Sequence, residues 1–194
     1  MSHRHFLIHK PYGYLSQFVG EAKKKKLGEF HDFPEGIMAI GRLDEDSEGL
    51  LLLTTDGRMS EYVRGKKVEK EYYVQVDGQM TDAAVAQMQV GVEIGIHGVK
   101  FLTNPCAARR LDPAPAFAPR TRKIRDDRHG PTSWVSITLT EGKFRQIRKM
   151  TAAVGFPTLR LFRVRVGTIW LDDLAAGAVV EVSDFGLWGR SRTR

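Results

Sequence analysis

The sequence predicts an α+β protein built on a mixed, mainly antiparallel sheet. Segments of strand length outnumber the helical segments, and the two kinds do not alternate regularly along the chain, which argues against a doubly wound fold. The 194 residues, 42% of them hydrophobic, suit one domain, or one domain made of two lobes that share a sheet. Neither an internal repeat nor a linker divides the chain into separate domains.

The first part of the chain is predicted to form three strands and a short helix. Residues 6–10 give the first strand, which Pro11 and a glycine turn stop. A second strand is expected at residues 37–40, after a Pro-Glu-Gly turn. Residues 50–54 form a continuous apolar run before an Asp-Gly turn, which favours a buried strand over a helix. A short helix is expected at residues 58–64.

The rest of the chain is predicted to hold four strands and two helices. Residues 70–77 alternate and carry two tyrosines, which is typical of a strand. A Thr-Asp pair is expected to cap a helix over residues 83–90. Another helix is expected at residues 143–154, before a glycine and a proline that end it. The further strands are expected at residues 134–140, 158–166 and 179–182.

Between these elements, residues 103–132 are predicted to be a long, poorly packed loop. The segment holds five of the eight prolines and six arginines. Loops of this length are usually functional or disordered.

The net charge of +7 favours a polyanionic partner, most simply nucleic acid, through neutralisation of phosphates. The basic residues are clustered at residues 23–26, 120–128 and 143–149, at Lys66, Lys67 and Lys70, and at Arg190, Arg192 and Arg194. The lysine run at residues 23–26 fits a solvated helix face equally well. The arginine-rich clusters point more clearly to phosphate, because a guanidinium matches phosphate geometry with two hydrogen bonds.

Several classes of function find no support in the sequence. There is no phosphate-binding glycine loop, dinucleotide fingerprint or histidine pair at metal spacing, so neither a cofactor nor a metal is expected. Cys106 is the only cysteine and cannot form an internal disulfide, which is consistent with a reducing compartment. No apolar run reaches the length of a membrane span and no signal-peptide core is present, so a cytoplasmic protein without membrane contact is expected.

The strongest functional signal is the segment 41–57, which sets Asp44 beside Arg42 just after an expected buried strand. The strand would fix the carboxylate in place while the following turn leaves it open to a cleft, which suits a nucleophile or a general base. An acidic turn between two strands is the purely structural alternative.

Basic and aromatic side chains elsewhere could surround that carboxylate. Tyr72 offers a ring and a hydroxyl from the strand at residues 70–77. Arg145, Arg148 and Lys149 are spaced i, i+3 and i+4 in an expected helix, where they would form one basic face. Such a face is also an ordinary solvated stripe. Close to Asp44, however, an arginine would stabilise the ionised carboxylate, and the other two cations could bind a substrate.

Three blocks follow one another in the chain: GRLD with SEGLL at residues 41–51, KEYYV at residues 70–74, and EGKFRQIRKM at residues 141–150. The third block continues into VG at residues 154–155 and LRLFR at residues 159–163. In this order they resemble the catalytic motif, the tyrosine strand and the third motif of RNA pseudouridine synthases, in the RsuA branch that acts on ribosomal RNA. The resemblance extends from about residue 6 to about residue 182.

The resemblance implies a role for each matching residue. Asp44 would be the nucleophile, and Arg148 would pair with it. Tyr72 would stack on the uracil, and Leu161 would pack against the other side of the base. Arg42 would hold the nucleotide once its base has left the helix stack, although a structural ion pair with a nearby glutamate, Glu45 or Glu48, would also explain an arginine there.

The implied reaction isomerises one specific uridine of 23S ribosomal RNA to pseudouridine. The bond from ribose C1′ to N1 breaks, the base turns, and C1′ joins C5, with no redox change and no net hydrolysis. The aspartate could attack either C1′ of the sugar or C6 of the pyrimidine. The implied partner is 23S ribosomal RNA or the pre-ribosomal large subunit, and the protein is expected to act as a monomer.

The implied fold has two lobes with a central catalytic cleft, as one catalytic domain over residues 1–184 followed by a basic tail over residues 185–194. Most members of this branch carry a small helical RNA-binding domain before the catalytic core. The sequence instead begins directly with the strand at Phe6, so no such S4-like domain is expected.

Two rival functions remain to be weighed. A non-catalytic RNA-binding or ribosome-assembly protein on the same scaffold would have no need for Asp44, Tyr72 and Arg148 together. A glycoside hydrolase would need a second acid across the scissile bond, and Asp46 or Glu48 lies too close to Asp44 in the sequence to suit that role.

Overall fold

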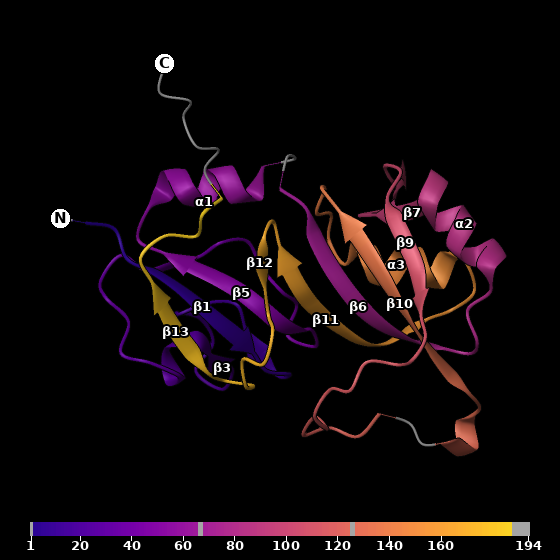
Figure 1. The fold of residues 1–194 in the computed structure, drawn as a ribbon, viewed down its shortest axis with the longest axis horizontal. Coiled ribbons are helices and arrows are strands. Elements are labelled where there is room, and N and C mark those ends of the chain that lie inside the picture. The colour runs from indigo at the N-terminus through magenta and orange to yellow at the C-terminus, as the bar shows by residue number, and fades with distance from the viewer. Residues whose placement is uncertain (1, 66–67, 125–126, 188–194) are drawn as a thin grey trace. The chain divides into compact units, whose positions relative to one another are not determined.

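The computed structural model describes residues 2–65, 68–124 and 127–187 (Figure 1). The chain forms two compact units: unit 1 comprises Met1–Glu69 and Arg163–Arg194, and unit 2 comprises Lys70–Phe162. Among the described residues, three α-helices accompany mostly antiparallel strands, which confirms the α+β class. The basic residues expected to bind phosphate at Lys66, Lys67, Arg125, Arg190, Arg192 and Arg194 lie outside the described residues.

The sheet of unit 1 has the order β13 (Val179–Val182), β1 (His5–Lys10), β5 (Glu48–Thr54) and then the last four residues of β11 (Thr158–Val166). Two short strands add to it: β4 (Met38–Ala39) pairs with β5, and β12 (Ile169–Trp170) pairs with β11. A separate parallel pair joins β2 (Tyr14–Leu15) to β3 (Lys25–Lys26). The helices of unit 1 are the 3-10 turn η1 (Leu27–Glu29) and α1 (Gly57–Arg64).

Strand β5 is the centre of unit 1, and every one of its seven residues is buried. Leu50 and Leu52 belong to one apolar cluster with residues of α1. On the neighbouring strand β1, the Phe6 side chain is fully buried and contacts the ring of Phe33 edge-on, with 5.5 Å between centroids. Apolar side chains therefore cover both faces of the sheet, which is why the continuous leucine run forms a strand without polar alternation.

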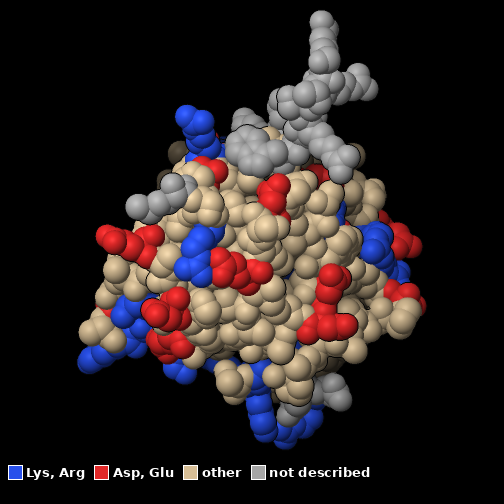
Figure 2. Space-filling model, turned by 60° about the vertical axis from the view of Figure 1, so that its left-hand side comes forward, with Lys and Arg blue, Asp and Glu red and all other residues tan. Residues whose placement is uncertain are grey.

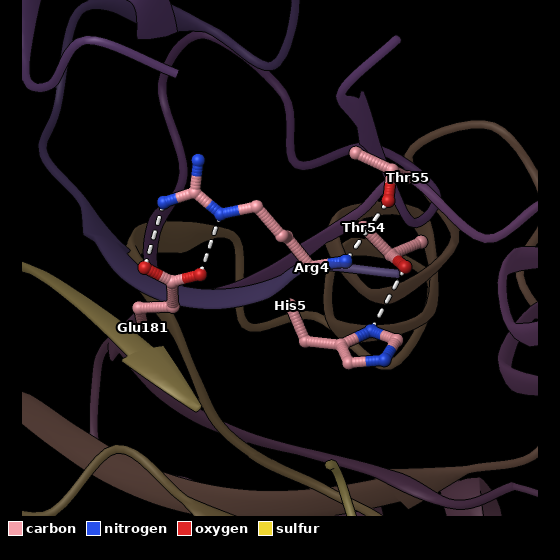
Figure 3. A network of polar contacts seen from close by, with 5 residues as sticks. All are labelled: Arg4, His5, Thr54, Thr55 and Glu181. Carbon is pink, nitrogen blue, oxygen red and sulfur yellow. Dashed lines mark hydrogen bonds and ion pairs between the residues drawn. The ribbon is translucent and has the colours of Figure 1, made fainter. Parts of the chain in front are cut away.

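Polar contacts fix the N-terminal end of β1 against both of its neighbours (Figure 3). The guanidinium of Arg4 donates two hydrogen bonds to the carboxylate of Glu181, at 2.6 and 2.8 Å. The Arg4 backbone N–H bonds Thr55 Oγ1 at 2.9 Å, and His5 Nδ1 lies 2.9 Å from Thr54 Oγ1. The exposed ion pair adds little stability by itself, so burial of β5 is the main source of the stability of this sheet.

The sheet of unit 2 has the order β11 (its residues up to Phe162), β6 (Lys70–Asp77), β10 (Thr132–Leu139) and β9 (Ala107–Leu111). The strands β7 (Glu93–Ile96) and β8 (Val99–Leu102) form a separate antiparallel hairpin. The helices are α2 (Asp82–Val90), the 3-10 turn η2 (Asp127–His129) and α3 (Gln146–Ala153).

One apolar cluster joins α2 and α3 to a single face of this sheet. Alternate residues of β6 and β10, such as Val74 and Val135, belong to the cluster together with Met88 of α2 and Met150 of α3. Because successive residues of a strand point to opposite faces, these alternate positions all face the two helices. The opposite face carries Tyr73, Trp134 and Phe162, whose rings all contact the ring of Phe117.

Four expectations require correction. The segment 103–132 is not one poorly packed loop, because β9 lies inside it and Phe117 packs on the sheet. The hairpin of β7 and β8 was not expected. Helix α3 begins at Gln146 rather than at residue 143. Phe185 is buried in the core of unit 1, so the folded body extends beyond the expected boundary at residue 184.

Candidate active site

The turn that carries Asp44 is held by the N-terminal segment of unit 1. Ser16, which is buried, clamps the preceding residue: its Oγ accepts a hydrogen bond from Leu43 N at 2.9 Å and donates one to Leu43 O at 2.7 Å. On the other side, the N–H of Gly13 donates to Glu45 O at 2.8 Å. The backbone is therefore fixed immediately before and after Asp44. The Asp44 side chain itself is half-buried.

Lys10 lies fully buried at the end of β1, under this turn. Its ammonium donates to Pro11 O at 3.0 Å and, in a longer contact, to Glu45 O at 3.5 Å. Burial lowers the pKa of Lys10 to about 8, although the carboxylates of the turn act in the opposite direction, namely Glu48, Asp46, Asp44 and Glu45. The positive charge of the buried ammonium thus stabilises the negative charges of the acidic turn.

The glycine of the SEGLL block is required by packing. Gly49 has a φ of +107°, and a Cβ at this position would overlap the backbone oxygen of Arg163. Arg163 in turn buries its guanidinium and donates from Nε to Leu50 O at 2.7 Å. Only glycine permits this close approach of β11 to β5 directly after the Asp44 turn.

Arg42 is exposed, two residues before Asp44. The alternative that Arg42 pairs with Glu45 is not what the structure shows. The carboxylate of Glu45 accepts instead from Lys24, at 3.0 and 2.8 Å. An exposed guanidinium beside the turn remains available to a ligand.

In unit 2 the structure brings Tyr72 and Leu161 to the same apolar cluster. Leu161 is 5% exposed and is a member of the cluster, while Tyr72 is half-buried and packs against it. Helix α3 contributes Ile147 to the same cluster, so the half-buried Arg148 extends from a helix that packs beside these two residues. Tyr72, Leu161 and α3 are therefore part of one rigid core.

Of the three cations expected on one face of α3, Arg148 and Lys149 lie within the helix and Arg145 lies at its N-cap. Arg145 precedes the helix in a left-handed backbone conformation, with φ 52° and ψ 34°. Lys149 lies in the helix, but its ammonium donates to Gly95 O of the β7–β8 hairpin at 2.7 Å. A periodic pattern of cations could not reveal that the helix starts one residue after Arg145.

The candidate residues are thus distributed over both units. Unit 1 holds Arg42 and Asp44, and unit 2 holds Tyr72, Arg145, Arg148, Lys149 and Leu161. The sequence interpretation missed Lys10 and Ser16. Lys10 did give a signal, since it is a lysine at the end of an apolar strand, just before a proline.

In the part of the chain that the structure describes, neither the thiol nor the possible metal ligands form a second centre. Cys106 donates from Sγ to Met88 O at 3.2 Å, and burial raises the pKa of its thiol to about 11, so the thiol is neutral near pH 7. Within residues 2–65, 68–124 and 127–187, no three His, Cys, Asp or Glu side chains gather in a way that could hold a metal ion. No helix in that same part of the chain is both long enough and apolar enough to cross a membrane.

Comparison with known proteins identifies the family. A family model described as RNA pseudouridylate synthase matches residues 4–153, which include the Asp44 turn, Tyr72 and Arg148. The chain belongs to this family. The strands and helices described above are accordingly those of a pseudouridine synthase catalytic core, and the enzyme is an isomerase.

Individual members of the family are similar over most of the chain. Ribosomal large subunit pseudouridine synthase E of Xanthomonas axonopodis pv. citri is 43% identical over 87% of this chain and 88% of its own length. Ribosomal small subunit pseudouridine synthase A of Escherichia coli is 32% identical over 90% of this chain and 68% of its own. A crystal structure of a pseudouridylate synthase superposes with a TM-score of 0.73 at 27% identity, covering 93% of this chain and 70% of that one.

Proposed function

We propose that the protein converts one uridine of 23S ribosomal RNA to pseudouridine, with Asp44 as the nucleophile. The observation that carries this proposal is the Asp44 turn, a half-buried carboxylate whose backbone is fixed on both sides by Ser16 and Gly13. The 43% identical Xanthomonas relative, which is named as a large-subunit pseudouridine synthase, supports the choice of large-subunit RNA as the substrate. The substrate is free 23S RNA or the pre-ribosomal large subunit, met in the cytoplasm by a monomeric enzyme that contacts no membrane.

The reaction requires a fixed acid because the base must be released and recaptured in one place. The C1′–N1 bond breaks, the uracil turns, C1′ bonds to C5, and the C5 proton leaves while N1 gains one, so atoms and charge balance. The Asp44 carboxylate attacks C1′ of the ribose or C6 of the pyrimidine. In either route the Asp44 carboxylate must be ionised when it attacks. Arg148 is proposed to stabilise the ionised carboxylate and to orient it.

The other residues are proposed to hold the nucleotide. Tyr72 stacks on the uracil and its hydroxyl assists proton removal, while Leu161 offers apolar surface to the other side of the base. Because both pack on one core cluster, their positions are set before RNA binds. Arg42 helps to hold the nucleotide once its base has left the helix stack, a step that costs a few kcal/mol. Arg145 and Lys149 complete the substrate contacts.

The deciding experiment is the substitution Asp44→Asn, which keeps the shape of the side chain and removes its nucleophilicity. Pseudouridine formation should fall on the order of 10³-fold or more, because no other group supplies the covalent step. Affinity for the RNA should stay near the wild-type value. The measurement is chemical mapping of pseudouridine in large- and small-subunit ribosomal RNA, together with a binding assay.

Asp46→Asn is the matched control, since it makes the same chemical change two residues along the same turn. It should retain activity within a few-fold. Substantial turnover by Asp44→Asn would exclude Asp44 as the nucleophile. A wild-type protein that binds ribosomal RNA and leaves every uridine unmodified would favour the non-catalytic assembly protein instead.

A further inference from the structure

Phe144 is a large apolar side chain that unit 2 leaves in solvent. It is 56% exposed, in the turn between β10 and α3. Its ring stacks on the exposed ring of His97, with 5.7 Å between centroids and 21° between planes. His97 comes from the tip of the β7–β8 hairpin, where it has a left-handed φ of 49°. Two rings from separate segments of the chain thus form an exposed pair.

One ammonium lies against this ring pair, and a second lies against Phe101 of the same β7–β8 hairpin. The ammonium of Lys149 lies 5.2 Å from the centroid of Phe144 and also bonds Gly95 O, which ties α3 to the hairpin that carries His97. The ammonium of Lys143, on the exposed side of the turn, lies 4.9 Å from the centroid of Phe101. Aromatic faces beside ammonium groups match a nucleotide, which offers a flat base and a phosphate.

The turn that presents Phe144 is rigid. Gln146, only 3% exposed, donates from Nε2 to Glu141 Oε1 at 2.7 Å and accepts at Oε1 from Lys143 N at 2.9 Å. The same Glu141 oxygen also accepts from Asn104 N at 2.8 Å. This oxygen of the acidic side chain in the turn is therefore already used in hydrogen bonds within the protein. The intervening Arg145 adopts the left-handed region, a conformation that is unfavourable for a residue with a side chain.

A flexible turn would fold Phe144 back onto the protein to bury its ring. Here hydrogen bonds of a buried amide hold the turn instead, so the ring stays in solvent in one position. A preorganised aromatic group loses little conformational entropy when a ligand stacks on it. A strained backbone, here at Arg145, next to an exposed apolar ring, here Phe144, is typical of a binding surface.

We propose that Phe144 and His97 form a stacking platform for an unpaired base of the RNA substrate, with Lys143 and Lys149 neutralising the adjoining phosphates. The proposal rests on the proposed function in that RNA is the substrate, and it adds a contact distinct from the base that Asp44 attacks. RNA is favoured over a protein partner because ammonium groups border the rings. Unpaired bases on aromatic rings are a common mode of RNA recognition.

The test is Phe144→Leu, which keeps an apolar side chain and removes the ring. It is made in the Asp44→Asn background, so that a 23S ribosomal RNA fragment binds without reacting. The dissociation constant should rise about tenfold, in line with the loss of one stacked base. The slope of log affinity against log salt should stay the same, because stacking releases no counterions. Phe144→Tyr, which keeps the ring, should bind like the parent.

Two controls separate stacking from charge and from general damage. Lys143→Ala should reduce the salt slope by about one, as expected for one lost phosphate contact. Trp170→Leu removes a 43% exposed ring from unit 1 and should leave the affinity unchanged. With active protein, Phe144→Leu should raise KM and leave kcat near the wild-type value.

An unchanged dissociation constant in Phe144→Leu would overturn the platform and point to a protein partner for the exposed rings. Equal weakening by Phe144→Tyr and Phe144→Leu would also overturn it, because the ring would then not be the binding element. A failure of the stacking platform can be distinguished from a failure of the proposed function. A protein that makes no pseudouridine can still show the stacking effect, and an active one can lack it.

Discussion

At the scale of single residues, Lys10 is the most unusual group in the molecule, because a fully buried ammonium lies under the acidic turn of Asp44. Burial holds its pKa at about 8 against an ordinary value of 10.5. The unfolded chain therefore binds more protons than the folded one between about pH 8 and pH 10.5. The contribution of Lys10 to the free energy of unfolding must therefore rise with pH across that window, because the buried ammonium loses its proton and its charge.

The comparison of wild type with Lys10→Met tests this residue, since methionine has a similar length and no charge. Between about pH 7.5 and pH 9.5 the free energy of unfolding of the wild type should rise by about 2 kcal/mol relative to the variant. Urea unfolding at several pH values measures the difference. If the free energy of unfolding changed with pH in parallel for wild type and Lys10→Met, Lys10 would not be a buried ammonium with a lowered pKa. If Lys10→Met does not fold, Lys10→Arg, which stays charged over the window, is the comparison.

At the scale of elements, the segment between β9 and β10 is anchored on the sheet of unit 2 at Phe117. The ring of Phe117 stacks on Phe162, with 3.8 Å between centroids and 12° between planes. Next to it, Arg160 donates to Ala118 O at 2.8 Å and lies 4.4 Å from the centroid of Phe162. These contacts hold the segment on the sheet a few residues before Arg120 and Arg122.

Phe117→Ala should release this segment without unfolding unit 2, because the anchor lies on the sheet face opposite the main core cluster. Tryptic cleavage at the neighbouring Arg120 and Arg122 should become about tenfold faster, following the loss of local stability. Limited proteolysis followed by mass spectrometry gives the rate at each site. Phe144→Ala, which truncates an exposed ring elsewhere in unit 2, should leave the cleavage rate unchanged. Equal rates for Phe117→Ala and wild type would mean that the ring does not anchor the segment.

At the scale of the whole molecule, the net charge of +7 is not a uniform property of the surface. On the face drawn in Figure 2, acidic and basic side chains are interspersed among uncharged residues, apart from the atoms drawn in grey. An RNA held mainly by phosphate contacts needs several cations, and Lys143 and Lys149 of unit 2, each beside an aromatic ring, are two candidates.

RNA affinity should therefore depend steeply on salt. With about six neutralised phosphates, the association constant should fall on the order of 10³-fold from about 50 to about 200 mM salt. Titration of a labelled 23S ribosomal RNA fragment at four or five salt concentrations measures this slope. A flat response would remove the case for phosphate-dominated binding.

The local pattern of the sequence was sufficient for the elements whose signal is periodic. The strands at residues 70–77, 158–166 and 179–182 have the bounds that their apolar patterns predict. The three blocks in their order pointed to the family, which the comparisons then confirmed. The block at residues 41–51 also pointed to Asp44 as the nucleophile, which stays a prediction. These features depend on neighbours in the sequence, and so a sequence can specify them directly.

Contacts between distant residues required the tertiary structure. Strand β9 exists because Arg110 pairs with Val135, 25 residues later in the chain. The start of α3 at Gln146 depends on Glu141, whose Oε1 accepts from Gln146 Nε2 and also from Asn104 N, 37 residues earlier in the chain. In each case the free energy comes from a partner that no local pattern names. The sequence by itself determined the family and the regular strands, whereas folding alone decided that Lys10 is buried, that Phe117 packs on the sheet of unit 2 and that Phe144 stays in solvent.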